Sequence, residues 1–512
     1  MKPRYLTAIV AGILFGTSYI PFPPWAIFFC YATLWYAWLE AKSAREIFWT
    51  GALALFVGTV IGFNWVAYTV HEFGHMPWIV AVPVMFLFSA FANIYVPLVG
   101  VIWWHFSKRF ALNRGAKIAA LAVFTGLAER GFPMIFDWHF GYTWFYASFP
   151  AYQLADTVGF IGLANIGLFF NAMFLYAYVL YREGNPHAKF WFASVPAAFL
   201  VLNLIGAWKE RTLKPFDAKF SVLMVQPNIG NQEKLMSEKG WAYRETVLDR
   251  FSQLTRKGLE ANPLPDYIVW PETAFPDLIT DENLSTGYAA RLRASIQGFG
   301  TNLLTGGYSK TGPRQQTTNS FFALNREGRW LSPPYHKTIL LAFGEYLPGA
   351  EWYPKLYDLL PQVASFGRGP GPSVLDAGKI KIGVQICYEG LFDWFNRALA
   401  VKGAQAIVNV TNDSWYGKWQ QPMQHLYMTL ARAIEVRRPL VRSTNTGITT
   451  VVLANGDILP LGPLHQEWFS LYEVPYTLEP ATTPFMGWAY YAMPALLGLA
   501  VVAIPVVGRR KD

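Results

Sequence analysis

The chain alternates between long apolar runs and one long stretch of mixed composition. A helix of about 20 apolar residues crosses the roughly 30 Å hydrocarbon core of a bilayer. Eight runs are expected to do so: 6–20, 25–39, 50–70, 78–106, 118–132, 159–181, 190–208 and 488–507. The pattern therefore predicts seven transmembrane helices in residues 1–208, an outer domain in 209–487, and an eighth helix with a basic tail in 488–512.

Basic residues predict the orientation of these helices, because Lys and Arg collect in cytoplasmic loops. With the N-terminus inside, every loop assigned to the cytoplasm is basic, whereas the outer loops 21–24, 71–77 and 133–158 hold no Lys or Arg. Both termini are therefore expected in the cytoplasm and residues 209–487 outside it. No small-residue cleavage site follows the first run, so that helix is expected to stay attached.

Composition agrees with a membrane protein and excludes other classes. Hydrophobic residues make up 53% of the 512 residues and charged residues 15%, against about 25% charged in soluble domains. Two cysteines exclude a disulfide-dense secreted scaffold and a cysteine-only metal cluster. The net charge of +9 comes largely from the basic inner loops and tail, so it does not indicate a nucleic-acid partner.

Residues 209–487 have the pattern of an α/β domain. Short β-branched runs bounded by Gly, Pro or Asn predict strands. These runs are 220–226, 267–270, 302–306, 320–324, 380–387, 406–410, 440–443 and 449–453. Helical stretches at 241–260, 287–297, 390–401 and 424–437 lie between them. Strands interleaved with helices predict α/β layers rather than an all-β sandwich.

Three potentially reactive side chains lie at the borders of apolar segments. Cys387 ends a predicted strand before a turn and a helix, where N–H groups favour a thiolate and a developing oxyanion. Glu272 follows another strand after Pro271, and Lys337 precedes an apolar stretch. Taken singly, they could be a small buried thiol, a solvated carboxylate and a snorkelling surface lysine.

Four ordered segments resemble the signatures of a known superfamily. They are Trp270-Pro-Glu272, His336-Lys337, Phe343-Gly-Glu345 and Ile386-Cys-Tyr-Glu389. They resemble the Glu-Lys-Cys motifs of the nitrilase superfamily. That resemblance implies an α-β-β-α sandwich in which Cys387 is the nucleophile, Glu272 the general base and Lys337 the group that stabilises the tetrahedral intermediate.

Together with the predicted membrane helices, these motifs resemble the apolipoprotein N-acyltransferase family, and segments 411–417 and 438–448 fit as well. This implies the last step of lipoprotein maturation in the bacterial inner membrane, with the catalytic domain in the periplasm. A phospholipid, expected to be phosphatidylethanolamine, would leave its acyl chain on Cys387 as a thioester. The α-amine of a diacylglyceryl-cysteine at the N-terminus of an apolipoprotein would then accept it in a ping-pong reaction, without cofactor or metal.

The same family suggests further site residues. Glu345 would support the triad, and Tyr388 and Glu389 would shape the site beside the nucleophile. Trp241 loosely matches a functional tryptophan, and packing on the domain surface is its alternative. Residues 346–366 are rich in aromatic residues, leucine and proline, which suggests a lid at the membrane interface or else an ordinary packed loop.

Three other functions stay open. His71-Glu-Phe-Gly-His75 matches the H-E-x-x-H pattern of zinc proteases, although Gly74 weakens a helix there and no third ligand is evident. A membrane-tethered nitrilase-type amidase would use water as the acceptor and hydrolyse a lipid-linked amide. A non-catalytic scaffold or transporter would use Glu129, Arg130 and Asp137 as a polar path.

Overall fold

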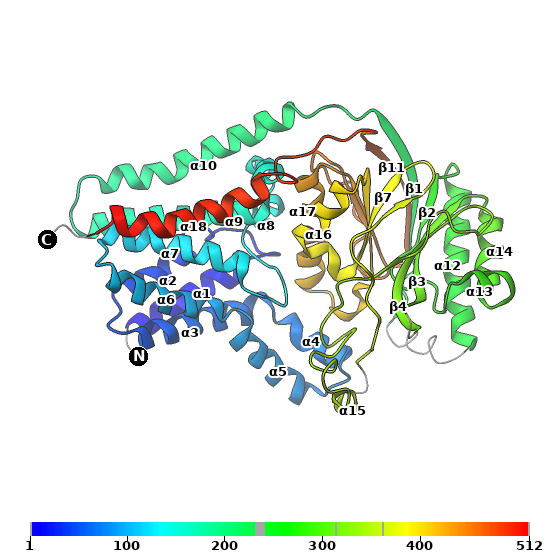
Figure 1. The fold of residues 1–512 in the computed structure, drawn as a ribbon, viewed down its shortest axis with the longest axis horizontal. Coiled ribbons are helices and arrows are strands. Elements are labelled where there is room, and N and C mark those ends of the chain that lie inside the picture. The colour runs from blue at the N-terminus through cyan, green and yellow to red at the C-terminus, as the bar shows by residue number, and fades with distance from the viewer. Residues whose placement is uncertain (1–2, 231–240, 313–314, 361–362, 510–512) are drawn as a thin grey trace. The chain divides into compact units, whose positions relative to one another are not determined.

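The computed structural model describes residues 3–230, 241–312, 315–360 and 363–509 of the chain. It divides into two compact units. The helical unit consists of Met1–Leu213 and Thr483–Asp512, and the α/β unit consists of Lys214–Thr482. Figure 1 shows the two kinds of architecture, helices alone in the first and strands flanked by helices in the second.

The helical unit follows the apolar runs of the sequence. Its helices are α1 (Pro3–Gly16), α2 (Cys30–Leu39), α3 (Ala44–Gly62), α4 (Trp65–Glu72), α5 (Trp78–Phe91), α6 (Tyr95–Arg109), α7 (Arg114–Gly131), α8 (Tyr142–Tyr146), η1 (Pro150–Leu154), α9 (Ala155–Arg182), α10 (Ala188–Arg211) and α18 (Ala489–Val507). Within the described residues, five helical segments are long and apolar enough to cross a membrane: Ala44–Gly62, Trp78–Arg109, Pro150–Arg182, Ala188–Arg211 and Ala489–Val507. The predicted spans 6–20, 25–39 and 118–132 correspond to α1 and α2, which are short, and to α7, which carries several charges.

Two of the predicted spans are interrupted. Run 50–70 is divided into α3 and α4, and run 78–106 into α5 and α6. The second break contains Asn93, whose amide donates to Thr59 Oγ1 at 2.8 Å and accepts from Trp138 Nε1 at 2.9 Å. A buried amide with these partners holds a local turn that apolar periodicity alone does not reveal.

The α/β unit is built on two sheets. The six-stranded sheet has the order β11-β1-β2-β3-β4-β5, and the five-stranded sheet has the order β10-β9-β8-β7-β6. The first contains β1 (Ala218–Gln226), β2 (Tyr267–Val269), β3 (Asn302–Thr311), β4 (Gln316–Leu324), β5 (Tyr335–His336) and β11 (Trp468–Tyr476). The second contains β6 (Val374–Asp376), β7 (Lys381–Ile386), β8 (Ala406–Thr411), β9 (Leu440–Thr444) and β10 (Thr450–Val452).

Helices cover the outer face of each sheet. On one side lie α12 (Trp241–Ala261), α13 (Asp281–Thr286) and α14 (Ala289–Phe299), and on the other α16 (Asp393–Val401) and α17 (Gln421–Val436). α12 packs on β1 and β11, and α16 and α17 pack on β7 and β9. The sheets contact each other through β1 with β9 and β4 with β7. The layers are therefore α-β-β-α, as the resemblance implied.

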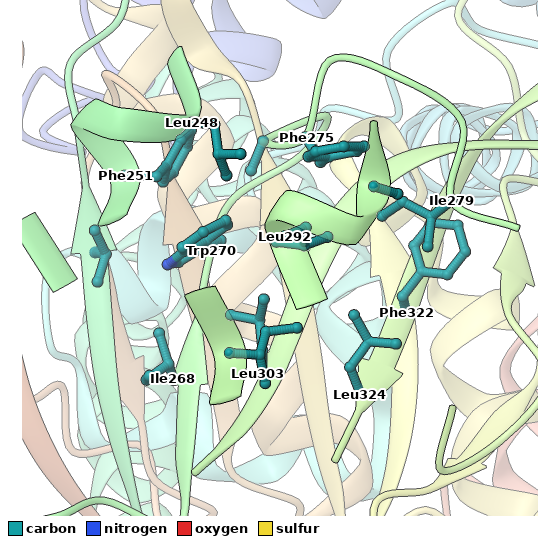
Figure 2. Close-up of a cluster of buried hydrophobic side chains, with 14 of the residues drawn as sticks. Leu248, Phe251, Ile268, Trp270, Phe275, Ile279, Leu292, Leu303, Phe322 and Leu324 are labelled. Carbon is teal, nitrogen blue, oxygen red and sulfur yellow. The ribbon is translucent and has the colours of Figure 1, made fainter. Parts of the chain in front are cut away.

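A buried apolar cluster under α12 and α14 holds the end of β2. Figure 2 shows Trp270 at its centre, with Phe251, Leu292 and Leu303 around it. The Phe251 and Trp270 rings stack at 4.7 Å, and Trp270 Nε1 donates to Thr255 Oγ1 at 3.0 Å. Because burying each large apolar side chain stabilises the fold by about 1.5–3 kcal/mol, this cluster fixes the backbone immediately before the predicted general base.

Candidate active site

Glu272 follows β2 in a segment held against the next strand. Gly306 N donates to Pro271 O at 3.2 Å, and Phe275 N donates to Gly306 O at 3.3 Å. A Cβ atom at Gly306 would lie 2.7 Å from Glu272 Cα and 2.5 Å from Thr273 N, so only glycine permits this approach. Thr273 then turns the chain with a φ of +46°. The Glu272 side chain is consequently buried at the strand end rather than solvated.

Lys337 directly follows β5, and its ammonium group is buried between two carboxylates. Its Nζ lies 2.8 Å from Glu345 Oε1 and 3.2 Å from Glu272 Oε1, and the residue is 1% exposed. Burial disfavours the charged form, but the negative charges of Glu272 and Glu345 outweigh it and raise the pKa of Lys337 well above its usual value. Lys337 is therefore a buried ammonium group, not a surface lysine.

Asn319 of β4 joins the two carboxylates and was not predicted from the sequence. Its Nδ2 donates to Glu272 Oε1 at 2.7 Å and to Glu345 Oε1 at 3.2 Å, and its backbone carbonyl accepts from Lys337 N at 2.8 Å. The second oxygen of Glu272 accepts from the backbone N–H of Asn412 at 2.9 Å. The sequence signal for Asn319 was faint: a polar residue one position before a predicted apolar strand.

Cys387 begins the 3₁₀ turn η2 (Cys387–Leu391), so the predicted strand 380–387 is one residue too long at this end. Its backbone has a φ of +53°, a conformation that non-glycine residues adopt at a cost of about 1–3 kcal/mol and that is common at functional sites. Burial raises the pKa of the thiol, the charge of Glu272 adds to that effect, and the charge of Lys337 opposes it. The thiol thus lies within electrostatic reach of both groups.

Glu389 ties together the segments that carry the lysine and the cysteine. Its Oε1 accepts from the Tyr335 hydroxyl at 2.6 Å and from the backbone N–H groups of Thr338 and Ile339 at 2.6 and 3.0 Å. Its Oε2 accepts from Ile386 N at 2.8 Å. Burial raises the pKa of Glu389 to about 7, although these donors partly offset the shift. The carboxylate is therefore a link between the two sheets, because β5 and β7 belong to different ones.

A fully buried charge network lies after β8. Asp413 accepts from Arg442 at 2.8 Å, from His425 Nδ1 at 2.9 Å and from Thr411 Oγ1 at 3.0 Å. Arg442 also donates to Asn409 Oδ1 at 2.7 Å. Burial would raise the pKa of Asp413, but His425 and Arg442 hold it well below its usual range. This network fixes the turn after β8. The backbone N–H of Asn412, in that turn, donates to Glu272, the general-base candidate.

Two candidates suggested by the family resemblance remain, Tyr388 and Trp241. Tyr388 is buried beside the cysteine and meets the Phe392 ring edge-on at 4.9 Å. Trp241 is the first residue of α12, and its side chain lies outside the described residues.

The zinc-protease pattern does not adopt the geometry that it requires. α4 ends at Glu72 and His75 has a φ of +49°, so His71 and His75 do not face one side of a continuous helix. His71 Nδ1 instead lies 2.7 Å from the carbonyl of Met76. Within the described ranges, no cluster of three His, Cys, Asp or Glu side chains could hold a metal ion.

Comparison with known proteins identifies the family. The Carbon-nitrogen hydrolase family matches residues 225–474, and the Apolipoprotein N-acyltransferase N-terminal domain matches residues 11–173. An apolipoprotein N-acyltransferase from Bdellovibrio bacteriovorus is 45% identical and covers 98% of this chain and 93% of its own length. The chain belongs to the apolipoprotein N-acyltransferase family. It is therefore an acyltransferase, with a carbon-nitrogen hydrolase domain and several apolar helices.

A second apolipoprotein N-acyltransferase, from Geobacter metallireducens, is 32% identical and covers 90% of this chain and 88% of its own length. Among solved structures, the amidase from Nesterenkonia sp. AN1 has a TM-score of 0.36 at 18% identity, covering 50% of this chain and 93% of the amidase. The full-length relatives, rather than the distant amidase, carry the assignment.

Proposed function

We propose that this acyltransferase moves an acyl chain from a membrane phospholipid, with phosphatidylethanolamine as donor, through a thioester on Cys387. The acceptor is the α-amine of the diacylglyceryl-cysteine at the N-terminus of an apolipoprotein. One observation carries the assignment of residues: a buried lysine held between Glu272 and Glu345, within electrostatic reach of a buried thiol.

In the first half-reaction, Glu272 takes the proton of Cys387 as the sulfur attacks the ester carbonyl of the phospholipid. Because the thiol pKa is raised, a free thiolate is unfavourable, so proton transfer accompanies the attack. The carbonyl oxygen becomes an oxyanion. Two N–H groups of Lys337 reach carboxylates in the described part of the chain, and we assign its third to this oxyanion. The leaving alkoxide takes the proton from Glu272 and departs as lysophospholipid.

In the second half-reaction, the neutral α-amine of the apolipoprotein attacks the thioester carbonyl. Glu272 accepts a proton from the attacking nitrogen, and Lys337 again supports the oxyanion. The carbon–sulfur bond breaks, an amide forms, and the cysteine sulfur recovers its proton from Glu272. Glu345, Tyr388, Glu389 and Asn319 act by positioning these groups, and neither half-reaction needs a cofactor or metal.

The substrates account for the membrane helices. Exposing lipid chains to water costs about 0.8 kcal/mol per CH₂, so a site for two lipids belongs at a membrane surface. We propose eight spans with both termini in the cytoplasm and the α/β unit on the periplasmic side of the bacterial inner membrane. The thirteen Lys and Arg residues in inner segments, against none in the outer loops, support this orientation.

Segment 346–366 is proposed to be the part of the α/β unit that enters the membrane interface. Trp352 is 87% exposed, and Tyr353 and Leu359 are also exposed. Next to them, Leu347, Ala350 and Val363 form a small apolar cluster of their own. A segment with its own core and exposed aromatic side chains is suited to the interface between water and lipid.

The direct test is the intact mass of detergent-purified protein incubated with phosphatidylethanolamine. We expect the wild type to gain one fatty-acyl mass that neutral hydroxylamine releases. Cys387→Ala should gain none, and Cys30→Ala, which removes the other cysteine, should behave as the wild type. A diacylated lipopeptide should then discharge the acyl group as an amide. Discharge to water alone would instead indicate the amidase, and acylation of Cys387→Ala would refute the thioester.

A further inference from the structure

A pocket of about 200 Å³ lies within the helical unit, at the end of α7 and the beginnings of α9 and α18. Most of its lining is apolar, and includes Leu127, Ile161 and Met493. Arg130, Asn165 and Tyr490 contribute its polar groups. Every lining residue belongs to the helical unit, so none of the proposed catalytic residues contributes to this pocket.

Asn165 is a buried amide whose polar atoms could bind a ligand. It is 1% exposed, and neither its Oδ1 nor its Nδ2 has a hydrogen-bond partner among the described residues. Leaving an amide unpaired in apolar surroundings is unfavourable. Gly126 makes room for it, because a Cβ atom there would lie 2.1 Å from Asn165 Oδ1. The amide is thus held at the pocket wall, where a bound polar group could reach it.

Arg130 adds a positive charge one residue before the end of α7. Its guanidinium lies over the Tyr490 ring, 4.2 Å from the ring centre. A planar guanidinium stacked on an aromatic ring suits a phosphate, because its five N–H groups form a fixed fork. In the proposed orientation this end of α7 faces outward, at the depth of lipid headgroups.

We propose that this pocket binds a glycerophospholipid of the outer leaflet, in addition to the acyl donor. The phosphate diester pairs with Arg130, and an ester or glycerol oxygen accepts from the amide of Asn165. A whole phospholipid is far larger than this pocket of about 200 Å³, so the pocket takes only the phosphate–glycerol part. The acyl chains then run along α18, where Leu496 and Leu499 are exposed. The inference takes only the orientation from the proposed function.

The test uses the full chain as Cys387→Ala, so that bound lipid is not consumed. The probe is a dioleoyl phosphatidylethanolamine with a photoreactive diazirine on the acyl carbons nearest the glycerol, and labelled peptides are mapped by mass spectrometry. We expect labelling in 158–165 and 485–497. Unlabelled phosphatidylethanolamine should compete, whereas dioleoylglycerol, which lacks the phosphate, should compete at least tenfold less well. Glycerol 3-phosphate tests whether the phosphate alone is the ligand, and is expected not to compete.

Variants separate this site from general lipid contact. Arg130→Gln and Asn165→Leu should each reduce labelling of these segments at least tenfold, and Arg130→Lys, which keeps the charge, should reduce it less. The matched control is Arg114→Gln, at the opposite end of α7 and paired with Glu183, which should label as Cys387→Ala alone does. Equal competition by dioleoylglycerol, full competition by glycerol 3-phosphate, or unchanged labelling in a folded Arg130→Gln protein would overturn the proposal. The competition experiments with dioleoylglycerol and glycerol 3-phosphate test the pocket even if Arg130→Gln fails to fold. The catalytic proposal is tested separately, by measuring thioester formation in an Arg130→Gln protein that keeps Cys387.

Discussion

Replacing Gly306 with alanine should slow acylation sharply, although Gly306 carries no reactive group. The new Cβ would lie 2.5 Å from Thr273 N and 2.7 Å from Glu272 Cα, whereas ordinary contacts begin at 3.4 Å. The backbone beside Glu272 must therefore move by about 0.9 Å. A shift of about 1 Å in a catalytic group can cost about 100-fold in rate. We expect a fall of about that size in the rate of thioester formation.

The neighbouring glycine provides a matched control. A Cβ at Gly307 would meet Ile279 Cδ1 at 2.9 Å, which is the end of a flexible side chain that can turn aside. Overpacking of either position should cost roughly 1–3 kcal/mol of stability, so both variants are expected to melt at lower temperatures than the wild type. Only Gly306→Ala should also displace Glu272, while Gly307→Ala should acylate within about threefold of the wild type.

The assay is time-resolved intact mass after mixing with phosphatidylethanolamine, at a temperature where each variant is folded by circular dichroism. The rate constant for the gain of acyl mass is compared among the three proteins. If Gly306→Ala acylates within threefold of the wild type, the close approach of β3 to Glu272 does not control the base. If Gly307→Ala slows as much, general loss of packing explains both.

Three further outcomes are expected. Arg442→Met leaves Asp413 buried with His425 but without its guanidinium partner, so it should destabilise the α/β unit by up to about 3–5 kcal/mol, and adding Asp413→Asn should recover part of the lost melting temperature. The pKa of Glu389 is raised from 4.5 to about 7, so folding favours its protonated form. The free energy of unfolding, measured by melting, should therefore fall by about 3 kcal/mol as pH rises from about 4 to 7. Glu389→Gln should lack this pH dependence. Because the pKa of the Cys387 thiol is raised, iodoacetamide should alkylate it slowly at pH 8 and faster at higher pH. In Lys337→Met the alkylation rate at pH 8 should be lower still, because the positive charge that favours the thiolate is gone. Equal rates in the two proteins at pH 8 would show that the ammonium does not act on the thiol.

Strong periodic patterns predicted most of the elements, and the misses have identifiable causes. The strand at 220–226 and the helix at 241–260 lie within one or two residues of β1 and α12. β11 was not predicted. It contains Pro475, which argues against a strand unless the strand is at an edge, and β11 is the edge strand of the six-stranded sheet, beside β1. The tie between Asn93, Thr59 and Trp138 across the break after α5 likewise depends on residues distant in sequence.

The site shows the same division. Glu272, Lys337 and Cys387 were predicted because each lies at the border of an apolar segment in a recognisable motif, and their roles remain predictions. Asn319 was not, since its importance depends on two carboxylates that lie 47 and 26 positions away. Arg442 could have been found: a charged residue inside an apolar strand requires a buried anion, and Asp413 supplies it.

The charges around Cys387 favour a protected nucleophile rather than a permanently activated one. Lys337 is shared by two carboxylates, so its single positive charge does not outweigh the burial and the negative charge that raise the pKa of the thiol. The thiolate is the form that oxidants attack, and the periplasm proposed for this unit is oxidising. A buried, neutral thiol resists oxidation there, and it becomes nucleophilic only when a bound ester allows Glu272 to take its proton during attack. This predicts that hydrogen peroxide inactivates the resting enzyme slowly at neutral pH. Glu272→Gln, which removes a negative charge that raises the thiol pKa, should lose acylation while its thiol reacts with peroxide faster than that of the wild type. Rapid loss of the free thiol in the wild type, or an unchanged peroxide rate in Glu272→Gln, would contradict this reasoning.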